Sequence, residues 1–294
     1  MKTPQQPYPE LAKALGISEL YLKREDLHTY GSHKGRSIPL MIKLHTKAGK
    51  NSFGISSSGN AALAAIFTVQ NHNRNNPSHP ITLRIFIGQH INEEKKKRLE
   101  AEITDPSIIT IEQVARPKQT VFQLEKEGTL VSLRQSTDDT ALQGYAELAG
   151  ELDKIEHIQA IFVPTSSGTT AQGLAEAFQH LQHKPQIHIV QTTACHPIAQ
   201  EFDKNFTETE SSLAGAIVDT IAHRKSTLNN LITTSHGSGW IISDEEIKTA
   251  VNLVKKHTNL SISYNSALSV AGIKKAIASG WTWNGPVVTL ICGR

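Results

Sequence analysis

The sequence has 294 residues, of which 38% are hydrophobic, and it contains 19 glycines. Its 30 basic and 27 acidic residues leave a net charge of +3 at pH 7, which is too small to indicate a nucleic-acid binder or a protein held at an acidic membrane surface. This composition excludes disordered, collagen-like and coiled-coil proteins, and the length indicates about two globular domains or lobes.

Short apolar segments predict strands at residues 19–23, 51–56, 81–87, 107–111, 129–133, 158–163, 187–191 and 287–291. Helices are predicted between them at residues 61–70, 92–100, 139–151, 171–181, 244–258 and 266–277. Residues 222–238, which are rich in Ser, Thr and His, are expected to form a surface loop. The alternation predicts an α/β fold with two lobes, each a mostly parallel twisted sheet with helices on both faces.

The cysteine content and the apolar segments indicate where the protein works. Cys195 and Cys292 are the only cysteines, so a disulfide framework is excluded and a reducing compartment is expected. Residues 1–11 contain three prolines and no signal-peptide core, and no run approaches the ~18 consecutive apolar residues of a membrane span. We therefore expect a cytoplasmic protein that binds no membrane and no nucleic acid. The histidines of residues 72–80 lack the spacing of metal ligands, so no metal site is predicted.

Two polar loops follow predicted strands and precede predicted helices. The first is Ser57-Ser58-Gly59-Asn60, and the second is residues 165–170, which carry five hydroxyl groups. Ligands of open α/β sheets bind outside the carboxyl ends of the strands, and a helix N-terminus favours an anion. The sequence therefore predicts a carboxylate or phosphate site at either loop. The alternative interpretation of each loop is a capped helix that follows a strand.

A third segment carries a lysine in an unusual setting. Residues 23–27 (Lys-Arg-Glu-Asp-Leu) are followed by Gly31-Ser32-His33-Lys34 and then by an apolar helix. A lysine between a tight turn and an apolar helix is expected to be partly buried, although most lysines are solvated surface charges. Burial lowers the pKa of a lysine and frees its amine to form a Schiff base.

Together these segments resemble the fold-type II pyridoxal phosphate (PLP) enzymes, the superfamily of the tryptophan synthase β-chain, threonine synthase, threonine dehydratase and cysteine synthase. Residues 23–34 are similar to the family's active-site lysine motif, residues 57–60 to its asparagine loop and residues 163–170 to its phosphate loop. Residues 243–247, 266–272 and 290–294 resemble its C-terminal helices and last strand. The resemblance covers nearly the whole chain, with the segments in the family's order.

The resemblance implies PLP as the cofactor, held in a cleft between the lobes, and a role for each matched residue. Lys34 would be the catalytic residue, forming the Schiff base with PLP and then moving the proton at the substrate Cα. Asn60 would hydrogen-bond the 3′-oxygen of the cofactor. The substrate carboxylate would be bound by Ser57, Ser58, Gly59 and Asn60, and the cofactor phosphate by Ser166, Ser167, Gly168, Thr169 and Thr170.

Cys292 stands where the family places Ser or Thr beside the pyridine nitrogen of the cofactor. A neutral partner there favours elimination over transamination, chemistry that the cofactor mostly supplies. The alternative interpretation is that Cys292 only fills the core, as buried cysteines commonly do. The phosphate loop differs from the family as well, since it has one glycine where most relatives have three or four.

The resemblance also implies the domain boundaries and the assembly. We expect a smaller lobe at residues 35–138 and a larger lobe made of residues 1–34 and 139–294. Because homodimers are usual in the family, a homodimer is expected by analogy.

The expected activity is that of a PLP-dependent lyase that acts on an L-amino acid by elimination or replacement at the β- or γ-carbon. Residues 57–62 and the C-terminal helices look most like threonine synthase, but residues 135–143 lack the arginine that would clamp the phosphate of phosphohomoserine. The pair Asp138-Asp139 resembles serine/threonine dehydratases instead, or only caps a helix.

Three alternatives therefore stay open. They are a serine/threonine dehydratase, a cysteine synthase-like β-replacement enzyme, and a non-catalytic relative that binds PLP or an amino acid. A nucleotide-binding oxidoreductase is disfavoured because the sequence has no glycine-rich dinucleotide fingerprint.

Overall fold

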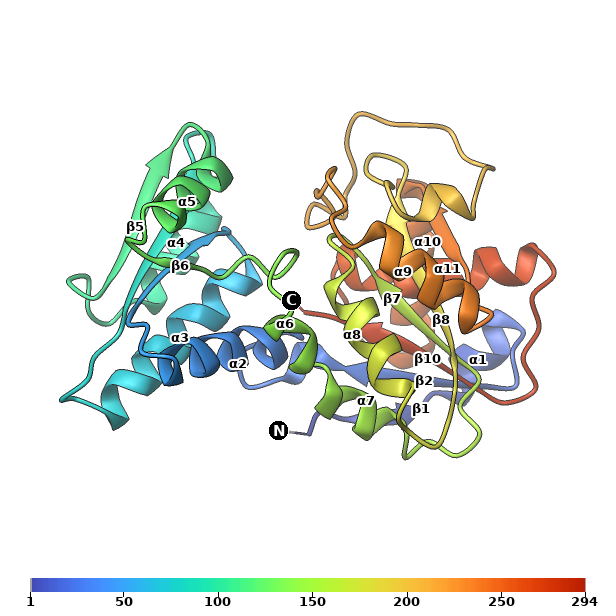
Figure 1. Ribbon diagram of the computed structural model, residues 1–294. Coiled ribbons are helices and arrows are strands. Elements are labelled where there is room, and N and C mark those ends of the chain that lie inside the picture. The colour runs from blue at the N-terminus through green and yellow to red at the C-terminus, as the bar shows by residue number, and fades with distance from the viewer. Residues whose placement is uncertain (1, 294) are drawn as a thin grey trace. The chain divides into compact units, whose positions relative to one another are not determined.

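The computed structural model describes residues 2–293, which form two compact units (Figure 1). Unit 1 comprises residues 2–28 and 145–293, and unit 2 comprises residues 29–144. The predicted lobes had their boundaries at 34/35 and 138/139, so unit 2 is longer at both ends than the predicted smaller lobe. In particular, Lys34 lies in unit 2, because it is the first residue of a helix that packs within that unit.

Unit 1 is built on a six-stranded sheet with the order β1-β2-β10-β7-β8-β9. Its strands are β1 (Gln5–Pro7), β2 (Glu19–Arg24), β7 (Ala160–Pro164), β8 (Gln186–Thr192), β9 (Gly239–Ile242) and β10 (Pro286–Ile291). All neighbours are parallel except β1 and β2. The last strand of the chain, β10, lies between β2 and β7, and all six of its residues are buried.

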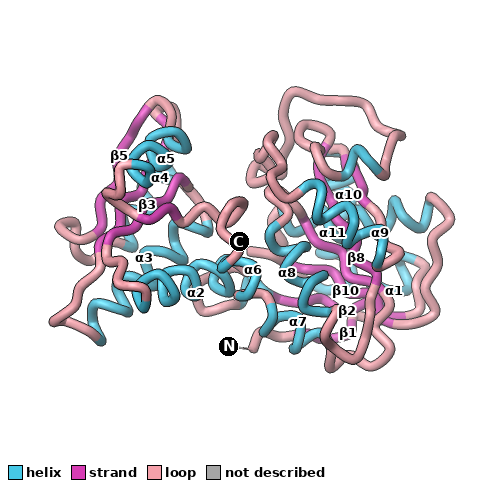
Figure 2. The backbone as a smooth tube through the Cα atoms, viewed as in Figure 1, coloured by secondary structure: helices cyan, strands magenta, loops and turns pink. Residues whose placement is uncertain are grey.

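Helices cover both faces of this sheet (Figure 2). They are α1 (Pro9–Leu15), α7 (Ala146–Leu152), α8 (Thr169–Phe178), α9 (Lys225–Thr234), α10 (Asp244–Thr258) and α11 (Tyr264–Ala278), with the short 3-10 turns η1 (Glu25–Leu27) and η2 (Ala199–Glu201). Side chains of α1, α10 and α11 share one apolar cluster with the sheet, and those of α7, α8 and α9 share another. The two clusters bury the strands on both faces, as parallel sheets require.

Unit 2 contains a four-stranded parallel sheet with the order β5-β4-β3-β6. Its strands are β3 (Ser52–Ser56), β4 (Thr82–Gly88), β5 (Ile109–Val114) and β6 (Val131–Ser132). Its helices are α2 (Lys34–Lys47), α3 (Asn60–Asn75), α4 (Glu93–Glu102), α5 (Pro117–Lys126) and α6 (Thr140–Gln143). The main apolar cluster joins α2 and α3 to the sheet, and a smaller cluster of Phe86, Val121 and Leu130 lies under α5.

The predicted fold class is confirmed, since each sheet is mostly parallel and carries helices. Every predicted strand is present, and β1 and β9 are additional. The prediction that residues 222–238 form a loop was wrong, because residues Lys225–Thr234 form α9, which buries Leu228 and Ile232. Helices α1 and α5 were not predicted either.

The predicted helix 139–151 is two helices, α6 and α7. Gly144 lies at the break, where a Cβ atom would be 2.4 Å from the carbonyl oxygen of Arg36. The backbone at Gly144 therefore passes the backbone of α2 so closely that a side chain would not fit here without a shift.

Among residues 2–293, no helix has both the length and the hydropathy that crossing a membrane requires.

The core of unit 1 contains a buried histidine in an aromatic cluster. His188 on β8 stacks on Phe162, with ring centroids 4.4 Å apart, and all three tryptophans of the sequence lie around it. Trp240 Nε1 donates to His188 Nδ1 at 3.2 Å, so the ring hydrogen is on Nε2, which lies 3.2 Å from Gln186 Oε1. Burial of this satisfied neutral ring lowers the pKa of His188 to about 3.

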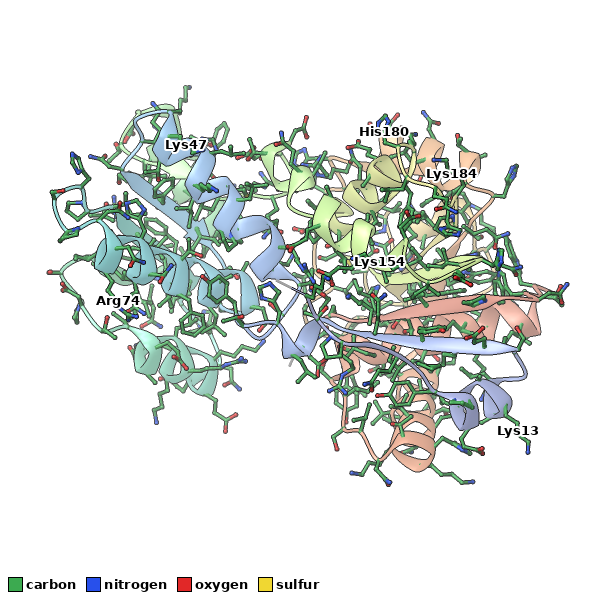
Figure 3. All side chains as sticks on the ribbon, turned by 90° about the horizontal axis from the view of Figure 1, so that it is seen from below. Lys13, Lys47, Arg74, Lys154, His180 and Lys184 are labelled. Carbon is green, nitrogen blue, oxygen red and sulfur yellow. The ribbon has the colours of Figure 1, made fainter. Side chains whose placement is uncertain are left out.

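We predict that His188 makes unit 1 less stable in mild acid. The unfolded chain binds a proton at the ordinary histidine pKa of 6.5, whereas the folded protein binds one only near pH 3. Stability that is present above pH 6.5 is therefore lost as the pH falls toward 3, with a limiting slope of about 1.4 kcal/mol per pH unit. The free energy of unfolding, measured against pH, should fall less steeply in His188→Gln than in the wild type. The matched control is His180→Gln, at an exposed position of the same unit (Figure 3), and an identical slope in His188→Gln and the wild type would refute the prediction.

Candidate active site

Lys34 begins α2 in unit 2, directly after a tight turn. Gly31 has a φ of +73°, a conformation that favours glycine, and the Ser32 side chain is fully buried. The backbone N–H of Lys34 donates to Ser32 Oγ at 3.3 Å. The lysine side chain is partly buried, as predicted, and its Nζ donates to Gln135 Oε1 at 3.1 Å. The amine is therefore held at a defined position beside a polar side chain.

The predicted carboxylate loop, residues 57–60, connects β3 to α3 in the same unit. Its residues are only half-buried, and the N–H of Gly59 donates to Ser57 Oγ at 3.3 Å. Asn60 is the first residue of α3, whose preceding position, Gly59, has no side-chain cap. Hydroxyl groups and backbone amides at the start of a long helix suit a carboxylate. Because α2 packs on α3, the structure brings Lys34 and this loop onto neighbouring helices.

The predicted phosphate loop connects β7 to α8 in unit 1. Gly168 has a φ of +90°, and a Cβ atom there would be 2.9 Å from Leu228 Cδ2. The conformation and the contact both favour glycine at this position, which is the single glycine that the loop retains. Ser167 and Thr169 share a hydrogen bond of 2.9 Å between their hydroxyls, and Thr169 and Thr170 are buried in the first turn of α8.

Ser166 differs from the rest of the phosphate loop. Its hydroxyl oxygen accepts the backbone N–H groups of Val218 and Asp219, both at 3.2 Å, and lies 3.5 Å from a carboxylate oxygen of Asp219. The side chain therefore ties residues 218–219 to the loop. The hydroxyl of Ser166 is therefore already engaged by backbone N–H groups of residues 218–219.

Sequence reasoning missed a cation beside this loop. Arg224 precedes α9 and is buried, with its Cβ 3.6 Å from the position that a Cβ on Gly168 would take. Its Nη1 donates to Gln172 Oε1 at 3.3 Å. The signal that could have found it is the helical spacing of Leu228 and Ile232, which predicts α9 and places Arg224 at the start of that helix.

Cys292 follows β10 and is 8% exposed. Its backbone N–H donates to Ser266 Oγ at 3.1 Å, and its Sγ lies 3.7 Å from the same oxygen. Ser266, on α11, is fully buried and also donates to the carbonyl of Gly293 at 3.2 Å. The thiol thus lies next to the hydroxyl of Ser266, a residue for which the sequence predicted no role at the site.

Asp138 precedes α6 and accepts a hydrogen bond from its first residue. Its carboxylate accepts the backbone N–H of Thr140 at 2.9 Å and lies 2.8 Å from His45 Nε2. Burial raises the pKa of Asp138, but the hydrogen bonds from His45 and Thr140 outweigh it and hold the pKa below its usual range. These contacts support the interpretation of Asp138 as a helix-capping residue.

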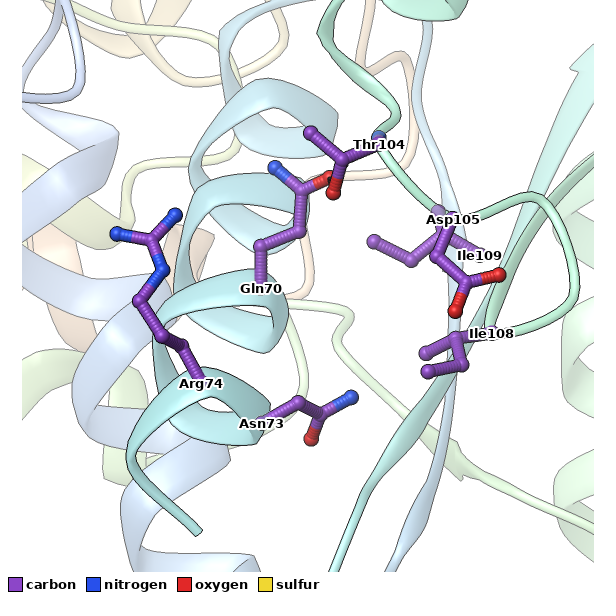
Figure 4. A pocket seen from close by; sticks show the side chains of 7 residues that line it. All are labelled: Gln70, Asn73, Arg74, Thr104, Asp105, Ile108 and Ile109. Carbon is purple, nitrogen blue, oxygen red and sulfur yellow. Dashed lines mark hydrogen bonds between the residues drawn. The ribbon is translucent and has the colours of Figure 1, made fainter. Parts of the chain in front are cut away.

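A pocket with polar and apolar lining residues lies on unit 2 (Figure 4). This pocket of about 200 Å³ lies between α3 and the loop before β5, lined by Gln70, Asn73, Arg74, Thr104, Asp105, Ile108 and Ile109. None of the predicted site residues lines it. Across residues 2–293, no three His, Cys, Asp or Glu side chains lie close enough together to hold a metal ion.

Comparison with known proteins gives consistent results. A family model described as "Pyridoxal-phosphate dependent enzyme" matches residues 1–293. Threonine synthase of Methanocaldococcus jannaschii is 23% identical over 301 residues, which is 95% of this chain and 70% of the relative.

Solved structures share the fold at low identity. A processed threonine deaminase isoform 2 of Solanum lycopersicum has a TM-score of 0.79 at 17% identity, covering 100% of this chain and 79% of that one. A PLP-dependent aspartate racemase has a TM-score of 0.81 at 16% identity, covering 100% and 90%. Serine racemase of maize has a TM-score of 0.79 at 16% identity, covering 100% and 88%.

Proposed function

The chain belongs to the pyridoxal-phosphate dependent enzyme family, whose cofactor is pyridoxal 5′-phosphate, and from this premise we propose a lyase that acts on an L-amino acid. The reaction is elimination or replacement at the β- or γ-carbon, and threonine synthase-like chemistry is the first candidate. The observation that carries the proposal is the partly buried amine of Lys34, held at 3.1 Å from Gln135 at the start of α2.

The side chains present fit the cofactor. The loop that would receive its phosphate has hydroxyl donors, a glycine at a φ of +90° and a buried arginine beside it. These groups replace the glycine-rich loop of most relatives by donors and a positive charge. We assign the phosphate to Ser166, Ser167, Gly168, Thr169 and Thr170.

The other groups of the cofactor have matching partners. Lys34 would attach it covalently through Nζ, Asn60 would hydrogen-bond its 3′-oxygen, and Cys292 would lie beside its pyridine nitrogen. A thiol is a weak donor and a weak acceptor, so Cys292 would leave that nitrogen without a proton.

We assign the substrate side of the reaction to unit 2. Ser57, Ser58, Gly59 and Asn60 would bind the substrate α-carboxylate at the N-terminus of α3, where the helix dipole favours a negative charge. When bound, the cofactor supplies the electron sink for charge that develops at the substrate Cα. The Lys34 amine would remove the proton at Cα and later return one, as a positioned general base and acid.

Product analysis distinguishes the reactions. The PLP-loaded protein is incubated separately with phosphohomoserine and with threonine. Release of phosphate from the first, without 2-oxobutyrate from the second, supports threonine synthase-like chemistry. Formation of 2-oxobutyrate from threonine supports a dehydratase, which the structural likeness to threonine deaminase keeps as the second candidate.

Two further substrates complete this test. Formation of cysteine and acetate from O-acetylserine and sulfide would support a cysteine synthase-like enzyme. A change in the visible spectrum with amino acids but no product from any of them would support the non-catalytic relative. We also infer from the family that the protein is a cytoplasmic homodimer. Sedimentation of the purified protein would test the oligomeric state.

We predict that the buried cation of Arg224 strengthens PLP binding. Replacing it by methionine removes a positive charge next to the predicted phosphate loop but keeps an unbranched side chain. The dissociation constant for PLP should rise about tenfold, as expected for the loss of a charged contact worth ~1–2 kcal/mol. Spectroscopic titration with PLP measures it.

The matched control for Arg224→Met is Lys225→Met. Lys225 is the next residue, but its Nζ pairs with Glu201 at the surface, at 2.6 Å. This variant should bind PLP like the wild type. If the two variants lose affinity equally, Arg224 has no specific role at the phosphate.

We predict that Cys292→Ser is tolerated. Serine is the residue that the family places there, and Ser266 offers a partner for its hydroxyl. The PLP dissociation constant should change by less than about threefold, and turnover should stay the same or rise slightly, because a neutral hydrogen bond contributes only ~1 kcal/mol. Cys195→Ser is the control for the exchange of a thiol for a hydroxyl. Cys195 lies in an apolar cluster of the same unit, where a hydroxyl in place of the thiol should lower thermal stability. Complete loss of PLP binding in Cys292→Ser would show that the thiol itself is required.

A further inference from the structure

We propose that Gln135, oriented by Ser37, is a positioning residue that holds the amine of Lys34 whenever this amine is not bonded to the cofactor. The inference rests on the proposed function, because it assigns Lys34 the task of attaching PLP. The contacts that carry it lie entirely within unit 2.

Two donors meet at one oxygen. Gln135 Oε1 accepts Lys34 Nζ at 3.1 Å and also Ser37 Oγ at 3.1 Å. Lys34 and Ser37 are three residues apart on α2, so their side chains project from the same face of that helix. The amide oxygen therefore faces α2, and the second donor fixes which end of the amide points to the lysine.

Burial makes this arrangement rigid. Ser37 is fully buried and Gln135 is 8% exposed, so exchange of these hydrogen bonds for water is disfavoured. Gln135 follows β6, whose neighbour β3 leads into the carboxylate loop at residues 57–60. The residue that holds the lysine thus lies three positions after a strand of the sheet that also carries the proposed substrate loop.

The side-chain amide of Gln135 is suited to this role because it is uncharged. Its oxygen accepts an N–H from the amine in either protonation state, and it adds no charge of its own. A carboxylate in the same place would favour the ammonium form, which cannot attack a carbonyl carbon. Gln135 can therefore orient the amine without suppressing its reactivity. Orientation matters at two moments, when the cofactor is first captured and when the substrate amine has displaced Lys34.

The test is the rate at which cofactor-free protein captures PLP, followed by visible absorbance and by borohydride trapping with mass mapping of the Lys34 peptide. In Gln135→Leu the oxygen is lost while the side-chain size is kept. We expect the second-order capture rate to fall about tenfold, because an amine without its partner samples several rotamers. Ser37→Ala should lower it about twofold to threefold, since Gln135 keeps its oxygen but loses its second contact. The losses should be the same at pH 7.5 and at pH 9.5 if orientation, and not proton occupancy, is affected.

The matched control is Gln113→Leu. Gln113 Oε1 accepts Lys96 Nζ at 3.0 Å in an exposed pair of the same unit, so the substitution is chemically identical. Gln113→Leu should capture PLP at the wild-type rate. During turnover, Gln135→Leu should lower kcat and leave KM nearly unchanged.

Several outcomes separate the possible failures. If the wild type and Gln113→Leu capture PLP but Gln135→Leu does so equally fast, with circular dichroism showing that it is folded, the positioning role is wrong. If Gln135→Leu raises KM and leaves capture unchanged, Gln135 contacts the substrate and not the lysine. If the wild type captures no PLP at Lys34, the proposed function itself fails.

Discussion

Lys34→Ala is expected to remove covalent attachment of PLP and to lower turnover by at least about 10³-fold, within the range for a catalytic acid or base. The reason is that one nitrogen has two tasks, holding the cofactor and moving the proton at Cα. Alanine supplies neither, and Gln135 Oε1 loses one of its two donors. The visible absorbance band of the loaded protein should be absent, and borohydride should trap no cofactor on the α2 peptide.

The matched control is Lys43→Ala, at an exposed position of the same helix. It should load PLP and turn over substrate like the wild type. Thermal unfolding of Lys34→Ala should stay close to that of the wild type, because the lysine is only partly buried. Activity retained in Lys34→Ala, with no added amine in the buffer, would remove Lys34 from its proposed role.

Lys23→Met is expected to destabilise unit 1 by about 3–5 kcal/mol, the range for removal of one partner of a buried ion pair. Lys23 is fully buried on β2 and forms a salt bridge with Glu151 of α7. Its Nζ also donates to the carbonyl of Thr3 at 2.9 Å and to Gln5 Oε1 at 3.1 Å. Methionine fills the space of the lysine stem but leaves the carboxylate of Glu151 without its cation.

Two further variants test this interpretation by chemical denaturation. Lys23→Met/Glu151→Gln removes both charges together and should recover at least half of the lost free energy of unfolding, because no unpaired charge remains. Lys13→Met, at an exposed position of α1 (Figure 3), should change stability by less than about 0.5 kcal/mol. If the double variant is no more stable than Lys23→Met, the pair is not what holds α7 to β2.

The lysine motif, residues 23–34, is divided between the two units. Lys23 is used inside unit 1 to join a strand and a helix, whereas Lys34 opens a helix of unit 2. A motif that is continuous in sequence therefore supplies a buried ion pair in unit 1 and the proposed catalytic lysine in unit 2. The charged residues near the proposed catalytic lysine are partly explained by packing, since Arg24 also pairs with Asp26, at 2.8 Å.

Much of the fold could be predicted from local patterns. The run of apolar residues at 81–87 predicts the buried strand β4, and Ser243 with Glu246 forms the capping box that begins α10. The misses have physical reasons. Strands β1 and β9 are only three and four residues long, too short for a period to be recognised, and α9 carries polar residues that obscured its apolar face.

The local structure around the candidate site could also be predicted, because each of its loops follows a strand and precedes a helix. Lys34 lies at the start of a helix, and the loops at residues 57–60 and 165–170 each connect a strand to a helix, as the sequence predicted. The distant residues that lie beside these segments could not be predicted from local patterns. Gln135 is 101 residues from Lys34, and α8, β8 and η2 lie between Gly168 and Arg224 in the sequence.

The amino-acid sequence alone determined the alternation of strands and helices, the lysine motif and the two polar loops, because these depend on neighbours within a few positions. Only the tertiary structure decided which distant side chains meet. It inserts the last strand, β10, between β2 and β7, and this places Cys292 beside Ser266. Strand order and helix packing depend on the burial of apolar surface over the whole chain, so the contacts of Lys23, Lys34 and Gly168 could be seen only after the chain was folded.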